Sequence, residues 1–186
     1  ERCYPGREFL PGTRFSIWGV AHEPTPESMH MSRMYHPMQN FTTEEEFASY
    51  PYPEFDPSQA EECRREVEAL HARGIAAMVP LNCTIWETAW YMRSMEEMMV
   101  GMMTDDPLTE RHFERITVLA EQRAAAFASC GADLLHLGDD IGMQQTIMMS
   151  HELYRKHLKP RLARVVQAAK AAKPDMVITY HSCGYV

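Results

Sequence analysis

Apolar residues in positions 57–186 follow two spacings that alternate along the chain. Apolar positions three and four residues apart indicate amphipathic helices, and short continuous apolar runs indicate strands buried on both faces. The predicted helices cover 57–73, 85–93, 95–103, 107–130 and 151–173. The predicted strands are Ile75–Leu81, Ala132–Leu137 and Met176–His181.

Helix start and stop signals flank these segments. The predicted N-caps are Asp56, Ser94 and Ser150, which carry the short oxygen side chains typical of that position. Gly74 and Gly131 follow predicted helices, where glycine readily adopts the left-handed backbone of a helix end. Pro160 falls inside the last predicted helix and should kink it, because proline lacks a backbone N–H donor.

Residues 1–56 lack this regularity. Seven prolines interrupt them, and each proline fixes its own φ angle and removes a hydrogen-bond donor. One strand is predicted at Arg14–Val20. A short helix is predicted at Thr43–Ser49, with a threonine at position 42 or 43 as its N-cap and a glutamate at position 45 or 46 in its first turn.

Helices and strands that alternate in this way predict parallel strands joined by right-handed crossovers. Three strands fit either a small doubly wound sheet or one part of a (β/α)8 barrel, which takes roughly 250 residues when complete. The sequence stops just after a predicted strand, so we expect an α/β fold that is a partial (β/α)8 (TIM) barrel, truncated at its C-terminus. Residues 1–56 are predicted to be an irregular N-terminal segment of the barrel domain, and residues 57–186 its βα units.

Composition and charge exclude several classes of protein. With 45% hydrophobic and 24% charged residues the chain is typical of globular domains, and its net charge of −8 disfavours nucleic-acid binding. The sequence has no run of 18 apolar residues, so no transmembrane helix is expected. It also has no basic cluster that would suggest binding to a membrane surface. The chain lacks a signal-peptide pattern at its start and has an odd number of cysteines, five, so we expect reduced thiols in a cytoplasmic protein.

The most specific chemical feature is the pair His181 and Cys183, at the end of the last predicted strand. Side chains two residues apart on a strand point to the same face. Imidazole and thiolate are natural zinc ligands, and the C-terminal ends of parallel strands are where barrel active sites gather. The alternative is a core histidine beside a buried thiol.

Two adjacent acids, Asp139 and Asp140, follow the strand Ala132–Leu137. They should point to opposite sides, and the inward acid could accept a proton, orient a ligand or bind a metal. The alternative is a carboxylate that only caps a loop. Gly142 could let the backbone approach a ligand closely.

A third feature is the aromatic segment 86–92, which follows the strand Ile75–Leu81. Glu87 lies at a strand-to-helix junction on the same expected face. Two indoles and a phenol there, including Trp86 and Tyr91, suit the wall of a substrate pocket. A core aromatic cluster is the alternative.

Several motifs in the right order resemble the uroporphyrinogen decarboxylase superfamily. Residues 131–142 are similar to its Gly-Ala-Asp strand with the following Asp-Asp loop, and residues 150–161 are similar to the helix after it. Residues 86–97 are similar to the preceding segment, so the resemblance covers about 75–186 well and 14–56 loosely. It implies a barrel in which Tyr91 is a substrate-pocket tyrosine. From their positions at the strand ends we also expect Trp86 and Gln144 to bind substrate. We expect Glu87, Asp139 and Asp140 to be catalytic and to orient the metal ligands.

This superfamily carries two chemistries. Uroporphyrinogen decarboxylases remove acetate carboxylates as CO2 without a cofactor, but their arginine-rich signature and catalytic aspartate segment are not found here. The ending His181-Ser182-Cys183-Gly184 is instead similar to that of the zinc-dependent methyltransferases. That resemblance implies a Zn2+ site with a third ligand outside this chain and a methyl transfer between a corrinoid (cobalamin) protein and a thiol or similar acceptor.

Three functions therefore stay open. The first is a zinc-thiolate methyltransferase whose partners are a small-molecule substrate and a corrinoid protein. The second is a cofactor-free carboxy-lyase of tetrapyrrole synthesis, and the third is an inactive partial barrel. The sequence does not decide the oligomeric state.

Overall fold

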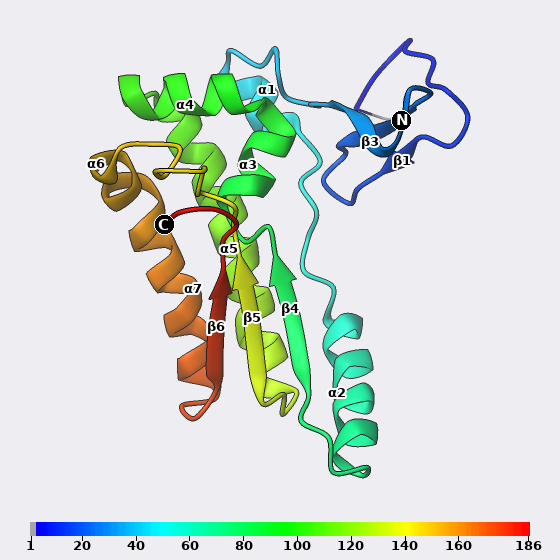
Figure 1. The fold of residues 1–186 in the computed structure, drawn as a ribbon, viewed down its shortest axis with the longest axis vertical. Helices are drawn as coiled ribbons and strands as arrows, with labels where there is room; N and C mark the ends of the chain where they lie inside the picture. Colours follow the sequence, from blue (N-terminus) through cyan, green and yellow to red (C-terminus); the bar gives the residue numbers. More distant parts are fainter. Residues whose placement is uncertain (1–2) are drawn as a thin grey trace. The chain divides into compact units, whose positions relative to one another are not determined.

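The computed structural model describes residues 3–186 (Figure 1). The chain folds as two compact units, each made of two stretches of sequence. Unit 1 combines the N-terminal residues up to Pro53 with Thr88–His112, and unit 2 combines Glu54–Glu87 with Phe113–Val186.

Unit 2 is built on a parallel sheet of three strands, β4 (Met78–Asn82), β5 (Leu134–Gly138) and β6 (Val177–His181), in the order β4-β5-β6. The sequence therefore placed all three strands correctly to within a few residues. Asn82 pairs with Gly138, and Gly138 pairs with His181. The C-terminal ends of the strands thus lie level along one edge of the sheet.

The two faces of this sheet differ in burial. Leu81, Leu135 and Leu137 point to one face and are almost fully buried. Met78 and Val177 point to the other face, where more than half of each side chain is exposed. An α/β barrel would place this second face toward its interior.

Helices precede the first strand and connect the others, as predicted. They are α2 (Pro57–His71), α5 (Pro107–Ser129), α6 (His151–Leu153), the π-helical turn η1 (Tyr154–Leu158) and α7 (Lys159–Ala172). Asp56 accepts the backbone N–H of Ser58, and Ser150 accepts that of Leu153, so both predicted N-caps are confirmed. Just before Pro160, where a kink was predicted, the helix contains a π turn in which Lys159 donates its backbone N–H to the carbonyl of Tyr154 five residues earlier.

Unit 1 corrects the prediction for the N-terminal segment. It holds an antiparallel sheet in the order β1-β2-β3, with β1 at Arg14–Phe15, β2 at Ala21–Thr25 and β3 at Ser28–Tyr35. The strand predicted at Arg14–Val20 is present only in its first two residues, and β2 and β3 were missed. Pro24 is tolerated inside β2 because β1 pairs only with Ala21 and His22, which leaves β2 without a second neighbour at Pro24.

Three further helices complete the described chain: α1 (Glu44–Ser49), α3 (Trp86–Arg93) and α4 (Met95–Thr104). Thr43 and Glu46 form the predicted capping box of α1, and Ser94 caps α4 as predicted. None of the helices within residues 3–186 is long and apolar enough to cross a membrane.

A fully buried histidine makes unit 1 sensitive to pH. The Nε2 atom of His112 lies 3.1 Å from the carbonyl oxygen of Ala89, and its Nδ1 atom lies 2.7 Å from the hydroxyl of Tyr52. Since the carbonyl can only accept, Nε2 carries the proton and Nδ1 accepts from Tyr52. Burial lowers the pKa of His112 to about 4, although the bond to Ala89 opposes this effect.

We therefore expect the free energy of unfolding to fall as the pH drops from about 6.5 to about 4. In that pH window His112 is protonated in the unfolded chain and neutral in the folded protein. The loss of stability therefore reaches roughly 1.4 kcal/mol per pH unit. Urea titrations at stepped pH values measure this slope. The His112→Gln variant should lose the contribution of His112 to this pH dependence. An unchanged slope in the variant would show that His112 is not its source.

Candidate metal centre at the strand ends

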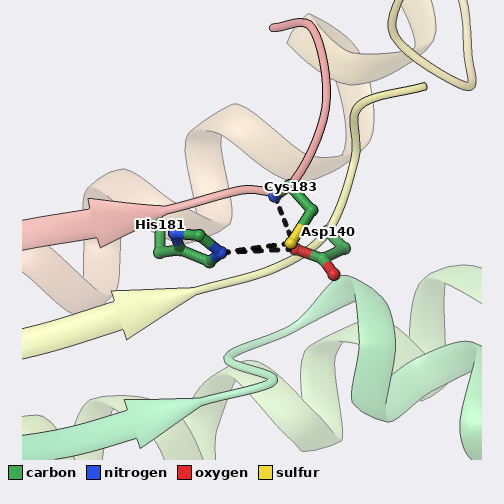
Figure 2. Close-up of side chains that lie close together, drawn as sticks. All are labelled: Asp140, His181 and Cys183. Atoms are coloured by element: carbon green, nitrogen blue, oxygen red, sulfur yellow. Dashed lines mark hydrogen bonds and ion pairs between the residues drawn. The ribbon is translucent and has the colours of Figure 1, made fainter. Parts of the chain in front are cut away.

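Three side chains that can bind a metal converge at the C-terminal ends of β5 and β6 (Figure 2). His181 is the last residue of β6, and Cys183 lies two residues beyond it. Asp140 follows β5 by two residues. One ligand atom from each of the three lies within 4.8 Å of the other two.

The imidazole and the thiol point toward each other, and Cys183 reaches this position from the bend that follows β6. The Nε2 atom of His181 lies 3.3 Å from the sulfur of Cys183 and 4.0 Å from Oδ1 of Asp140. In a tetrahedral zinc site the bond lengths place neighbouring ligand atoms roughly 3.5 Å apart. Nitrogen, sulfur and oxygen are all zinc ligands, so the residues fit this ion. Their role as ligands stays a prediction.

Hydrogen bonds from backbone amides hold this arrangement. Cys183 donates its backbone N–H to Oδ1 of Asp140 at 2.7 Å, and Asp140 donates its own N–H to Oε2 of Glu87 at 3.0 Å. Ile141 donates its backbone N–H to the hydroxyl of Ser182 at 3.0 Å. Glu87, at the start of α3, therefore orients Asp140, and Asp140 in turn orients Cys183.

The charge at this site favours a cation. Asp140, through a hydrogen bond and its negative charge, raises the pKa of the Cys183 thiol, and Glu87 adds to the effect from farther away. A second anion beside a carboxylate is unfavourable in the absence of a positive charge. A cation between Asp140 and Cys183 would reverse this effect, as a metal does for a coordinating thiol.

The carboxylates of Asp139 and Asp140 have different partners, and their projection to opposite sides stays a prediction. Asp139 is 4% exposed, and its carboxylate accepts the backbone N–H groups of Ile85 and Glu87 at the start of α3. Burial raises the pKa of Asp139 to about 7, although these hydrogen bonds oppose the shift. The structure places Asp139 as a cap of α3, which was the alternative interpretation, and its catalytic role stays a prediction.

Gly142 allows a close backbone approach, but to the site loop itself. A Cβ atom at this position would collide with the carbonyl oxygens of Cys183 and Tyr185, the second at 2.7 Å. Met143 beside it pairs with Tyr185, whose backbone N–H donates to the carbonyl of Met143. The absence of a side chain at Gly142 therefore lets the loop after β6 dock against the loop after β5.

We expect Gly142→Ala to displace this loop. The added methyl group should cost about 1–3 kcal/mol of stability and weaken metal binding about ten-fold or more. Urea denaturation and zinc titration with a competing chelator measure the two effects. Met143→Ala, which removes an exposed side chain and adds no atom at the contact, serves as the matched control. Equal zinc affinity in Gly142→Ala and the control would contradict this role.

The three predicted substrate-binding residues lie in different surroundings. Trp86 is fully buried in unit 2, and its indole N–H donates to the sulfur of Met148. Gln144 is exposed in the loop between β5 and α6. Tyr91 belongs to unit 1, where its ring packs edge-on against Trp90 at 4.2 Å between centroids. The structure gives Trp86 a place in the core, and the binding roles of all three residues stay predictions.

A cavity of about 350 Å3 opens elsewhere in unit 2. Its lining includes the basic side chains His151, Arg155 and Lys159 and the rings of Tyr154 and Tyr180. Tyr180 alternates with His181 along β6, so the cavity lies on the opposite face of the strand from the His181 imidazole. None of the predicted substrate-binding residues lines it.

The sequence indicated that one of the two acids, Asp139 or Asp140, could bind a metal, but it did not single out Asp140 as the third ligand beside His181 and Cys183. Asp140 was assigned to catalysis, and the third ligand was expected beyond the end of the chain. The available signal was the position of Asp140 after β5, the strand that pairs with β6. The separation of its carboxylate from Cys183 depends on two loops that meet only in the folded chain.

Comparison with known proteins defines the fold and the family. The chain is similar to the structure of a methyltransferase from Methanosarcina mazei, with a TM-score of 0.56 and 18% sequence identity over 83% of this chain. It spans 44% of that protein, so the fold is a partial barrel, as the sequence predicted. No curated protein matches the chain. The model of the uroporphyrinogen decarboxylase (URO-D) family matches residues 43–186, and the chain therefore belongs to this family.

Proposed function

We propose that this protein is a zinc-thiolate methyltransferase of the URO-D family, which moves a methyl group between a corrinoid carried by a partner protein and a thiol or similar acceptor. The observation that carries the proposal is the convergence of Asp140, His181 and Cys183 at the C-terminal ends of β5 and β6. In barrel enzymes the active site lies at this end of the strands.

His181 and Cys183 would hold the zinc ion through Nε2 and Sγ, and Asp140 is positioned to contribute a carboxylate oxygen. Three protein ligands leave a fourth tetrahedral position for a substrate, which is the pattern of catalytic zinc sites. When bound there, zinc lowers the pKa of an acceptor thiol, so that the nucleophilic thiolate is present near neutral pH.

The chain's own residues would set the geometry for this transfer. Asp140 fixes the loop that carries Cys183 through its hydrogen bond to the Cys183 amide. Glu87 holds Asp140 from α3, and Asp139 fixes the start of α3 from β5. Contacts of this kind orient metal ligands and change metal affinity about 10-fold to 100-fold when they are removed.

The comparisons support the proposal at a coarser level. The similar structure from Methanosarcina mazei is a methyltransferase, and at 18% identity the likeness concerns its fold. The family name favours a second candidate, cofactor-free decarboxylation of uroporphyrinogen. That reaction does not call for an imidazole and a thiol that converge with a carboxylate, so the geometry favours methyl transfer.

One pair of assays separates the two candidates. The complete protein, loaded with zinc, is incubated with methylcobalamin and a small thiol, and the loss of the methyl–cobalt absorbance is followed. In parallel it is incubated with uroporphyrinogen, and coproporphyrinogen is measured. We expect thiol methylation that His181→Ala abolishes, and no coproporphyrinogen. Zinc-independent formation of coproporphyrinogen without methyl transfer would establish the second candidate.

A further inference from the structure

A histidine in the middle of the sheet shares a face with the candidate metal centre. In the pairing of β5 with β6, His136 lies beside Thr179, and Gly138 lies beside His181. Residues two apart on a strand point the same way, so Thr179 and His181 project to one face of the sheet. The ring of His136 reaches Thr179 on that face, because its Nδ1 atom lies 2.8 Å from the Thr179 hydroxyl.

This polar pair is unusual for its position. The interior of an α/β barrel is filled in layers, mainly by branched apolar side chains. One layer below, the paired residues Leu134 and Val177 follow that rule. His136 and Thr179 are half-buried instead, and a polar group that leaves water needs hydrogen-bond partners for all its polar atoms. The Thr179 hydroxyl is the hydrogen-bond partner of Nδ1 of His136. The Nε2 atom of His136 needs a hydrogen-bond partner of its own.

The His181 ring has the complementary requirement. Its hydrogen bond and ion pair with residues of the described chain both use Nε2, the atom that faces Cys183 and Asp140. A histidine that binds a metal through one ring nitrogen almost always donates the N–H of the other to a second group, which fixes the ring and its tautomer. For His181 the donor would be Nδ1.

His136 is placed to meet this requirement. The centroids of the His136 and His181 rings lie 6.4 Å apart, with an angle of 36° between the ring planes. Gly138, the residue of β5 next to His181, has no side chain, and a Cβ atom at this position would lie 3.6 Å from the Cβ atom of His181. The separation of the two rings is too long for a direct hydrogen bond and suits one bridging water molecule.

We propose that His136 is a positioning residue for His181, and that it holds the Nδ1–H group of His181 through one bridging water. Thr179 anchors the His136 ring, and the bridge keeps the His181 proton on Nδ1, so that the lone pair of Nε2 faces Cys183 and Asp140. This inference rests on the proposed metal site and adds to it an element that none of the sequence motifs indicated.

Metal affinity tests the proposal directly. Zinc binding to the complete protein is measured by competition with a chromophoric chelator, and the visible spectrum of the cobalt(II)-loaded protein reports ligand geometry. We expect His136→Ala to weaken zinc binding about 10-fold to 100-fold and to change the cobalt spectrum. His136→Gln, whose amide can reach the position of Nε2, should restore most of the affinity.

Two further variants make the result specific. Thr179→Val removes the anchor and should give an intermediate loss, and it decides the matter if His136→Ala fails to fold. His151→Ala, at an exposed histidine of α6, should change nothing.

The failures are distinguishable. If the wild-type protein binds zinc and both His136→Ala and Thr179→Val bind it equally well, the inference is wrong and the metal site stands. If the wild-type protein binds no zinc, the proposed function fails as well.

Discussion

Replacing Cys183 with serine is expected to remove most of the zinc and to lower methyl transfer by more than about 100-fold. Removing a group that only hydrogen-bonds a metal ligand already lowers metal affinity or activity about 10-fold to 100-fold. Removing a ligand itself should lower them further. Cys183 is exposed and its sulfur faces the His181 ring, so serine at this position should leave the fold intact. Zinc content after dialysis and the initial rate of thiol methylation measure the two effects.

Cys63→Ser is the matched control for this experiment. Cys63 is a half-buried thiol on α2, and the same sulfur-to-oxygen change there should leave both zinc content and rate close to the wild type. Full zinc content in the Cys183→Ser protein would show that the thiol is not a ligand. The proposed site would then have to be abandoned.

Replacing Asp139 with alanine is expected to destabilise the protein by about 3 kcal/mol or more. The carboxylate of Asp139 accepts the backbone N–H groups of Ile85 and Glu87, and alanine would leave both donors without their partner. Each buried donor that loses its hydrogen bond costs about 1–3 kcal/mol. The start of α3 would also lose the hydrogen bonds that hold it to the end of β5. Glu87 would then no longer be fixed in position.

Urea denaturation measures this loss, and Asp139→Asn separates its causes. Asparagine keeps the shape and one acceptor oxygen, so the Asp139→Asn variant should retain part of the stability that alanine removes. A stability of Asp139→Ala within about 0.5 kcal/mol of the wild type, which is the range of ordinary surface substitutions, would contradict the capping role.

The elements of unit 2 were predictable because their signals are local. Asp56 and Ser150 precede their helices in sequence and cap them in the structure. The first strand was predicted three residues early, since an apolar run continues from Ile75 while the ladder with β5 begins only at Met78. The antiparallel sheet of unit 1 was missed because Pro24 suggests a loop, and its tolerance depends on how little of β2 pairs with β1.

The site was predictable in part for the same reason. His181 and Cys183 are two residues apart in sequence, so their proximity could be predicted from their spacing, although Cys183 lies in the bend after β6 and not in the strand. The place of Asp140 beside Cys183 joins residues 43 apart in sequence and depends on the loop contact at Gly142. The aromatic segment carried two interpretations, and only the fold shows that Trp86 lies in the core.

In the proposed site His181 and Cys183 bind the same cation. Titration of the metal-free complete protein with cobalt(II) tests it most directly, because a cobalt–thiolate bond gives an intense near-ultraviolet band. We expect this band to saturate at about one equivalent of cobalt, to disappear in Cys183→Ser and to be strongly weakened in His181→Ala. A band of wild-type intensity in Cys183→Ser, or no band in the wild-type protein, would contradict it.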